Sequence, residues 1–370
     1  MTIDSIRLNI LLGATVPEPA PERVIDALTS LEVRNNDSGR DGFQMTFTLG
    51  RDSLADYGLL RSGLLEPPAR VIIGVVVGVR AEVLVDGIIT NHQISPGTKP
   101  GEGSLVVTGE DISLKLDLDE RKESYANQSD SDIVRTILRR YSGDGIEPEV
   151  TATQIRPQES QRVPMQLGTD LSYIQELARQ NGFVFYVEPT RVPGVTTAHW
   201  GLQNFKSETQ PALTINMGPS TNVESMSFTF DALGPATPRV SILDPSSKVT
   251  ITVPVPSVSR PPLSQRQAES LRTTLPTDTA NLDSSQAALR GAAAATASAD
   301  AVTGSGQLDA VRYGGVLRAR QLVGVRGVDN SYDGSYYVKQ VTHKIKRGEY
   351  KQSFSLSREG RGALKPTVIP

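Results

Sequence analysis

A strict alternation of apolar and polar side chains runs through DGFQMTFTLG, residues 41–50. Phe43, Met45, Phe47 and Leu49 fall on one side of this stretch, and the polar residues between them fall on the other. Side chains alternate across a β-strand, so the pattern predicts a strand with one buried face and one wet face. Such a strand requires a sheet that covers an apolar core on one side only.

Other stretches of the first 118 residues also predict strands. VIIGVVVGV, residues 71–79, is apolar throughout and predicts a strand buried on both faces. It is too short for a membrane-spanning helix. AEVLVDGIITNHQIS follows, and we expect a turn or bulge at Asp86-Gly87. GEGSLVVTGED, residues 101–111, predicts another strand. Short strands divided by glycine and proline indicate a small barrel or sandwich over 1–118.

Residues 119–222 have a mixed pattern. SDSDIVRTILRRYSGDG, residues 129–145, predicts a helix that begins with a capping interaction between Ser129 and Asp132 and ends at Ser142-Gly143. Ile137 lies in the middle of its apolar stripe. Arg139 and Arg140 fall in its last turn, where positive charge suits the helix dipole.

LARQNGFVFYVEP, residues 177–189, predicts a second helix that ends at Asn181-Gly182 and turns directly into a strand. The aromatic residues of this strand are predicted to be core. These elements indicate an α/β insert over 119–222.

Residues 223–366 return to β patterns. Strands are predicted in NVESMSFTFD, PRVSILDP, LRARQLVGVRG, DGSYYVKQVTHKIKRG and YKQSFSLSR, the last with Tyr350, Phe354 and Leu356 on one face. Residues 255–305 interrupt the pattern with a proline-rich linker and an alanine-rich stretch. For the alanine-rich stretch we expect one solvated helix, with a flexible segment as the alternative. The predicted fold is mainly β with an α/β insert, and the outer parts are interpreted as two similar barrels.

The search for catalytic and metal-binding chemistry gives little. The chain has no cysteine and three histidines, His92, His199 and His343, at no metal-binding spacing. His343 is interpreted as a packing or surface residue. No nucleophile elbow or phosphate-binding loop is visible. We therefore predict no enzyme, no catalytic residue, no cofactor and no metal.

Three stretches that might suggest a site have simpler explanations. PGTKPGEGS, residues 96–104, is expected to be a hairpin loop. DLDERKE, residues 117–123, is acidic but lacks the glycine and the distant glutamate of a calcium loop. Asp130 and Asp132 are explained by helix capping.

Charge is unevenly distributed along the chain. The net charge is −3, but residues 311–370 hold 12 Lys/Arg against 4 Asp/Glu, an excess of +8, which leaves −11 on the rest. An acidic body with a basic end favours contact with a partner or another copy over nucleic-acid binding. Asp4 and Arg7 interrupt the apolar N-terminus, so we expect no signal peptide and synthesis in the host cytoplasm.

Several segments, taken in order, resemble one family. They are LVVTGEDISLKLDLDERKESYANQSDSDIVRTILRRYS, DLSYIQELARQNGFVFYVEP, GPSTNVESMSFTFDAL and LRARQLVGVRGVDNSYDGSYYVKQVTHKIKRGEYKQSFSLSREG. Together they are similar to the late control gene D family of phage tail hubs, and to the N-terminal hub domain of VgrG spike proteins. The resemblance spans about residues 1–366.

The resemblance implies two tail-tube-like β barrels, 1–118 and 223–366, with the α/β insert between them. It implies a homotrimer whose six barrels form a ring that adapts a six-fold tail tube to a three-fold spike and leaves a polar channel for cargo. The implied partners are other copies, the tube or tube-initiator protein, the spike and further baseplate proteins of a virion or injection particle. It identifies no channel or interface residue.

Two features depart from the family, and two other functions stay open. The chain ends without a needle-like repeat, so we expect the spike to be a separate chain. The linker and alanine-rich stretch are longer than expected.

The alternative functions are a tail-associated wall-degrading hydrolase and a carbohydrate-binding β protein. Trp200, the one tryptophan, lies in a turn-like stretch and is expected to be anchored in the insert.

Overall fold

The computed structural model describes residues 2–3, 6–13, 17–50, 57–99, 102–160, 163–205, 208–243, 250–255, 260–276 and 284–364. One 14-stranded sheet dominates it, and its strands are antiparallel except for one pair. The main path runs β1 (Thr2–Ile3), β2 (Ile6–Gly13), β6 (Arg70–Val77), β7 (Arg80–Ser95), β8 (Gly103–Asp111), β5 (Gly42–Leu49), β4 (Leu28–Asn36), β22 (Gly334–Lys346), β23 (Glu349–Arg358), β20 (Val302–Asp309) and β15 (Val223–Phe230). The prediction of a mainly β protein is confirmed.

Three further strands join this sheet beside the main path. They are β3 (Glu18–Pro19) on β2, β21 (Leu322–Arg326) on β22, and β14 (Gln210–Thr214), which lies parallel to β21. Strand β14 belongs to the predicted insert range but pairs within the C-terminal half.

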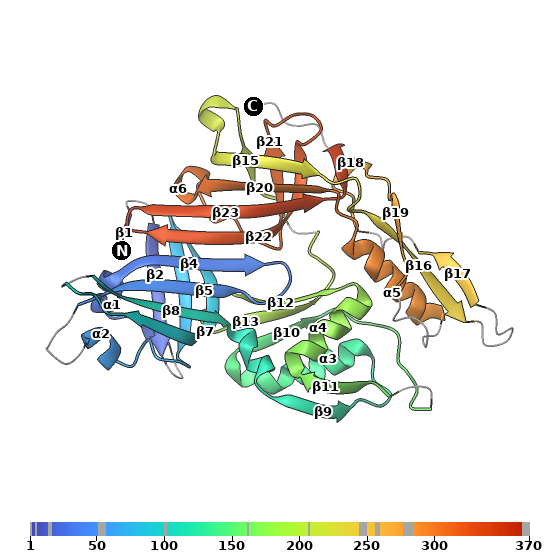
Figure 1. Cartoon of the computed structure of the whole chain (residues 1–370), viewed down its shortest axis with the longest axis horizontal. Helices are drawn as coiled ribbons and strands as arrows, with labels where there is room; N and C mark the ends of the chain where they lie inside the picture. The colour runs from blue at the N-terminus through green and yellow to red at the C-terminus, as the bar shows by residue number, and fades with distance from the viewer. Residues whose placement is uncertain are drawn as a thin grey trace.

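Both halves of the chain contribute to the large sheet, and they join where β4 pairs with β22 over seven residue pairs from Gln340↔Asn36 to Lys346↔Ser30. We call this pairing the seam. Each half curls around a core of its own, and Ile345 and Tyr350 of the C-terminal half complete the core of the first. Figure 1 shows the strands from β15 to β8 stacked side by side across the seam.

The alternation that predicted β5 is confirmed, because Phe43, Met45, Phe47 and Leu49 are all buried. Strand β6 is buried on both faces along most of its length. The expected turn or bulge at Asp86-Gly87 is wrong in position, because β7 continues through both residues and bulges at Leu84 and Thr90 instead. Asp86 is buried inside the strand, where Arg70 holds it with two hydrogen bonds of 2.8 Å.

The insert contains two small sheets and two helices. Its elements are a two-stranded ribbon of β9 (Glu120–Ser124) and β11 (Met165–Thr169), a sheet ordered β10 (Ile146–Val150), β13 (Thr196–Gly201), β12 (Val184–Pro189), and helices α3 (Asp130–Leu138) and α4 (Asp170–Asn181). Ser129 caps α3 by accepting from the Asp132 amide, as predicted. A 3-10 turn (Arg139–Asp144) then carries the chain to Gly145, two residues beyond the predicted end.

A second set of elements occupies residues 236–297 and packs against the insert. It comprises β16 (Ala236–Leu243) between β17 (Thr250–Pro254) and β19 (Arg272–Thr274), with helix α5 (Ser284–Ala297), while β18 (Ser264–Gln267) pairs with β24 (Gly360–Ala363). Five short helical turns complete the described elements: α1 (Glu22–Ala27), α2 (Gly58–Arg61), α6 (Ala310–Tyr313) and two 3-10 turns, Ile112–Asp117 and Gly218–Ser220. Residues 256–259 of the predicted linker lie outside the described ranges.

The expectation of a solvated alanine-rich helix is wrong. Ala287, Ala293 and Ala295 of α5 are buried, and the helix lies between β16 and α4. A Cβ on Gly291 would lie 2.5 Å from Val240 Cγ2, and one on Gly182 would lie 3.0 Å from Ala293 Cα. The small side chains therefore serve close packing, and the predicted range also ends too late, because β20 starts at Val302.

Candidate functional site: a buried polar junction, an ionic network and a cleft

Arg320 joins the three parts of the chain. Its guanidinium donates to Asp41 Oδ1 at 2.7 Å and to the Asn36 carbonyl at 2.7 Å in the N-terminal half. It also donates to the Val187 carbonyl of the insert at 3.2 Å and lies 4.2 Å from the centre of the Tyr186 ring. Arg320 and Asp41 are both almost fully buried. The two halves and the insert are thus held at one ionic contact.

A chain of hydrogen bonds leads from this ion pair into the seam. The Asn35 amide donates to Asp41 Oδ2 at 2.8 Å, and its Oδ1 lies 3.0 Å from His343 Nε2. His343 Nδ1 lies 2.8 Å from the Tyr350 hydroxyl. Because the Asn35 amide group already donates, we assign the proton of a neutral His343 to Nε2, and Nδ1 then accepts from Tyr350.

Burial sets the protonation of this junction. It lowers the pKa of His343 to about 3, with a smaller contribution from the positive charge of Arg318. Burial, followed by the charge of Asp41, raises the pKa of Asp111 to about 7, although Asp111 accepts from the Ser113 and Asp41 amides. The prediction that His343 is a packing residue is confirmed, since it lies inside the seam.

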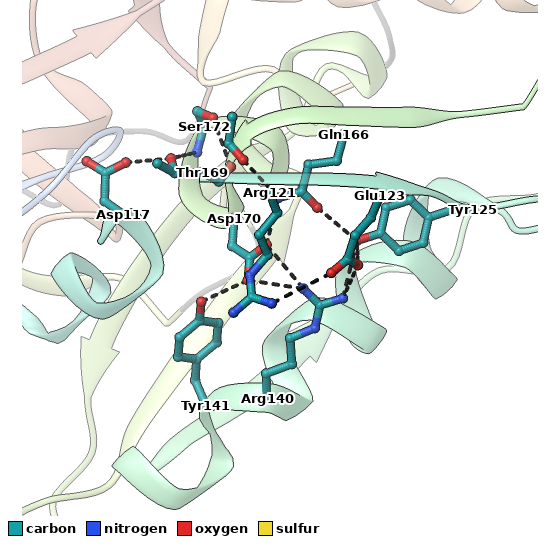
Figure 2. Close-up of polar contacts among 11 residues, drawn as sticks. Asp117, Arg121, Glu123, Tyr125, Arg140, Tyr141, Gln166, Thr169, Asp170 and Ser172 are labelled. Atoms are coloured by element: carbon teal, nitrogen blue, oxygen red, sulfur yellow. Dashed lines mark hydrogen bonds and ion pairs between the residues drawn. The ribbon is translucent and has the colours of Figure 1, made fainter. Parts of the chain in front are cut away.

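A second polar cluster lies under the β9–β11 ribbon (Figure 2). Asp170, fully buried at the start of α4, accepts from the Tyr141 hydroxyl at 2.8 Å and from the Gln166 amide at 2.7 Å. Arg140 lies 3.3 Å and Arg121 lies 3.5 Å from the same carboxylate. Two cations and two neutral donors therefore share one buried charge.

Glu123 extends this network toward solvent. It pairs with Arg140 and accepts from the Tyr125 hydroxyl at 3.0 Å, and the hydrogen bond from Arg140 lowers its pKa. The ribbon is unusual for an amphipathic strand pair, since Met165 and Leu167 are exposed beside Lys122 while Arg121 and Glu123 face the buried Asp170 network. Residues 120–123 of the acidic stretch 117–123 thus lie in a strand, and Arg140 serves this network in addition to the helix dipole.

A cleft of about 1030 Å³ lies between the insert and α5. The sheet β10–β13–β12 forms one of its walls, and Arg290 and Ala293 of α5 line it as well. Tyr186 and His199 stack there with ring centres 4.8 Å apart, and Arg320 covers the other face of Tyr186. Two polar contacts lie in the lining: His199 Nδ1 lies 3.0 Å from a carboxylate oxygen of Glu149, and Arg260 pairs with Asp300.

The residues considered from sequence lie in separate places. His92 is half-buried in β7, His199 lines the cleft and His343 lies in the seam. The described residues contain no group of three or more His, Asp or Glu side chains that could hold a metal ion. Asp132 takes part in the α3 cap, and Asp130 accepts from the Asn181 amide at 2.7 Å. Residues 96–99 and 102 lie between the paired strands β7 and β8, as a hairpin loop should, and β8 already begins at Gly103.

Trp200 is fully buried, and its indole donates to the Ile174 carbonyl at 3.2 Å. The prediction that it anchors the insert is confirmed, although it lies in strand β13 and not in a turn. The junction around Arg320 and Asp41 was missed from sequence, because no local pattern links residues so far apart in the chain.

Comparison with known proteins identifies solved structures of the same fold. A tail protein from Neisseria meningitidis MC58 superposes with a TM-score of 0.64 at 11% identity, over 97% of this chain and 98% of that chain. The 43 kDa tail protein of prophage MuSo2 from Shewanella oneidensis gives 0.66 at 14% identity, over 96% and 99%. An Escherichia coli component of the type VI secretion system gives 0.57 at 14% identity, over 93% and 77%. At these identities the likeness shows the fold, which is that of phage tail and VgrG-like proteins.

Sequence comparisons give less information about this chain than the structural comparisons do. A family model described as the Alg8 N-terminal domain matches residues 43–223, just under half of the chain. Its limits fall inside β5 and β15, so the matched range cuts across the large sheet and does not correspond to a structural unit. No curated protein matches the sequence. In the part of the chain that the structure describes, no helix is both long and apolar enough to cross a membrane.

Proposed function

We propose that this chain is the structural hub of a contractile tail or contractile injection system. Three copies form a ring that seats the six-fold tail tube on one side and the three-fold spike on the other, with a channel for cargo. The observation that carries the proposal is the shared fold over nearly the whole length of this chain and of the Neisseria and Shewanella tail proteins. A fold shared end to end supports a shared structural role more strongly than a single shared domain.

The open edge of the large sheet favours association. Strand β15 pairs with β20 on one side, and no strand in the described ranges pairs with its other side. It is eight residues long, and Ser225, Ser227 and Thr229 are exposed along it. Long edge strands without lysine, proline or a cover are rare in monomers, because they recruit other chains. A neighbouring copy is the cover that this proposal supplies.

The charge asymmetry favours contact between unlike ends. Residues 311–370 carry an excess of +8, and the remainder carries −11. A ring brings one surface of each copy against a different surface of the next. Part of this excess is used inside the chain, where Arg320 pairs with Asp41 and Lys351 with Glu224. Exposed basic residues such as Lys344 and Lys346 remain for attractive contact with an acidic surface of the next copy, which weakens as salt screens it.

In this proposal the chain is a structural protein and not an enzyme. It is made in the host cytoplasm and incorporated into a tail or baseplate, where its partners are the tube, the spike and other baseplate proteins. The chain should release no product from peptidoglycan. The buried position of Trp200 argues against the carbohydrate-binding alternative, because an exposed aromatic platform is what such a site usually presents.

Sedimentation of the purified protein tests the proposal. We expect a species three times the 39.8 kDa chain mass at low salt, alone or with co-expressed tube and spike proteins, and its dissociation as salt rises. A chain that stays monomeric over the accessible concentration range and with both partners would contradict it.

A further inference from the structure

Tyr186 brings an unused hydroxyl group to the cleft between the insert and α5. Its side chain lines the cleft and is only 5% exposed. His199 covers one face of the ring and Arg320 covers the other, so the ring is held in place. No group of the described residues forms a hydrogen bond with the Tyr186 hydroxyl. Buried polar groups are normally paired, and a ligand atom in the cleft would supply the missing partner.

The surroundings of this hydroxyl are acidic. Burial raises the pKa of Tyr186, and the negative charges of Glu188, Glu149 and Asp37 raise it further, against the positive charge of Arg320. These carboxylates come from β12, from β10 and from the residue that follows β4, and all three line the cleft. The phenol therefore keeps its proton, and its oxygen is free to accept a hydrogen bond from a cation.

Two of the three carboxylates have ionisable partners. Glu188 lies 3.6 Å from Arg318, and Glu149 lies 3.0 Å from His199 Nδ1. Arg318 also pairs with Glu82, so its positive charge is shared between two carboxylates. These contacts leave no excess of positive charge beside Tyr186.

The third carboxylate, Asp37, forms no ion pair with any residue that the structure describes. It accepts from the Ser38 hydroxyl at 3.2 Å and from the Gln203 amide at 3.1 Å, and both donors are neutral. Burial raises the pKa of Asp37, against the positive charge of Lys339, which itself pairs with Asp300 at 3.5 Å. A cation in the cleft would neutralise a carboxylate that the fold has partly desolvated.

The rest of the lining suits an alkyl chain. Phe183, Phe205 and Leu202 line the cleft, and Leu202 is 45% exposed. Ala293 and Ala294 of α5 line it too, and their small side chains leave the space open. The volume of about 1030 Å³ is at the upper end of the usual range for a small-ligand site. The alanine-rich stretch thus keeps a cleft open as well as packing closely.

We propose that the cleft binds a primary ammonium group carried on an alkyl chain, with Asp37 as its counter-ion and the Tyr186 hydroxyl as an acceptor. Two sources share this chemistry, a lysine side chain of a polypeptide and a free diamine. Arg179 and Arg290 lie on the helical side of the cleft and would repel a second ammonium group, which favours the lysine side chain. The inference does not depend on the ring, because every group named belongs to one copy.

Calorimetric titration of the purified chain tests the inference. The probes are acetyl-Gly-Lys-Gly-amide, the same peptide with norleucine in place of lysine, and cadaverine. We expect saturable binding of the lysine peptide and none of the norleucine peptide. Asp37→Asn should weaken binding about tenfold and Tyr186→Phe about fivefold, since each removes a contact to the ammonium group.

Two further variants separate the cleft from the rest of the surface. Ala294→Leu places a larger side chain in the lining, and we expect it to abolish binding. Glu120→Gln removes an exposed carboxylate of the β9–β11 ribbon outside the cleft, and it should bind as wild type does. Thermal unfolding shows that each variant is folded, and Tyr186→Phe retains the stacked ring if Asp37→Asn does not fold.

Equal binding of the lysine and norleucine peptides would overturn the inference, as would wild-type binding by both Asp37→Asn and Tyr186→Phe. Tighter binding of the lysine peptide than of cadaverine assigns the site to a polypeptide, and the reverse order assigns it to a free amine. Ring formation is measured separately by sedimentation. A chain that binds the peptide but forms no ring would therefore contradict the proposed function and leave this inference standing.

Discussion

In the junction beside the seam, the buried carboxylate of Asp41 has one cationic partner, Arg320, and both side chains are at most 3% exposed. In the β9–β11 ribbon, the buried carboxylate of Asp170 has two, Arg121 and Arg140, which are 35% and 27% exposed. The seam joins segments nearly 300 residues apart, whereas the network joins neighbours within the insert. The Asp41–Arg320 pair, which joins distant parts of the chain, is buried and contains a single cation. The Asp170 network, which lies within the insert, contains two cations that are partly exposed to solvent. The two regions should therefore respond differently when a partner is removed.

The largest loss of stability is expected where a new buried charge has no partner at all. Ile137 of α3 is fully buried among apolar side chains. We expect Ile137→Asp to lower the free energy of unfolding by about 5 kcal/mol and to unfold the insert, because the new carboxylate has nothing to neutralise it. Urea denaturation followed by Trp200 fluorescence measures this. Ile137→Val is the control at about 1 kcal/mol. An Ile137→Asp protein that melts within about a degree of wild type would show that this helix face is not buried.

The next largest loss of stability is expected when Arg320, the single cationic partner of Asp41, is removed. Arg320→Met leaves Asp41 buried without a cation, and we expect a loss of about 4 kcal/mol. The double variant Asp41→Asn/Arg320→Met should recover most of this loss, because it removes both charges together. Calorimetry of four proteins, namely wild type, Asp41→Asn, Arg320→Met and the double variant, closes the cycle. A single variant that costs under about 1 kcal/mol would mean that water reaches Asp41.

The neutral histidine of the seam gives a pH-dependent effect. The folded pKa of His343 is about 3, below the usual value of 6.5 that applies to the unfolded chain. Below pH 6.5 the unfolded chain binds a proton that the folded chain does not, so stability falls as pH falls from about 6.5 toward 3. Between pH 7.5 and 5 wild type should lose about 2 kcal/mol more than His343→Gln. Equal losses in the two proteins would show that His343 is protonated in the fold.

Removing one cation from the Asp170 network should cost less stability than removing Arg320. Arg140→Met leaves Asp170 with Arg121, Tyr141 and Gln166, so we expect a loss of about 1 kcal/mol. The exposed pair Arg34–Glu32 provides the reference, and Arg34→Met should change stability by less than about 0.5 kcal/mol. A loss at Arg140 as large as that at Arg320 would remove the distinction between the two regions.

Local sequence patterns predicted the elements whose causes are local. The alternation of β5, the Ser129 cap and the Asn181-Gly182 helix end are all confirmed. Each depends only on residues that are close together in the sequence. Asp86-Gly87 was misread because Arg70 of the neighbouring strand neutralises the aspartate inside β7. The ribbon was missed because Arg121, Glu123 and Gln166 face inward while Met165 and Leu167 are exposed, which is the reverse of the usual pattern.

The seam and the packing of α5 depend on contacts across the fold. Asn35 meets His343 only because β4 pairs with β22, and no spacing in the sequence encodes that pairing. Alanine is a good helix former in water and also the residue that allows close approach, so composition alone did not separate a solvated helix from one packed on Gly182 and Val240. Long-range register is the information that a single sequence does not carry.

Electron microscopy of the purified protein, classified without imposed symmetry, tests the central claim most directly. The account predicts three-fold rings with a central hole. Compact single copies, seen both alone and with the tube and spike proteins, would contradict it.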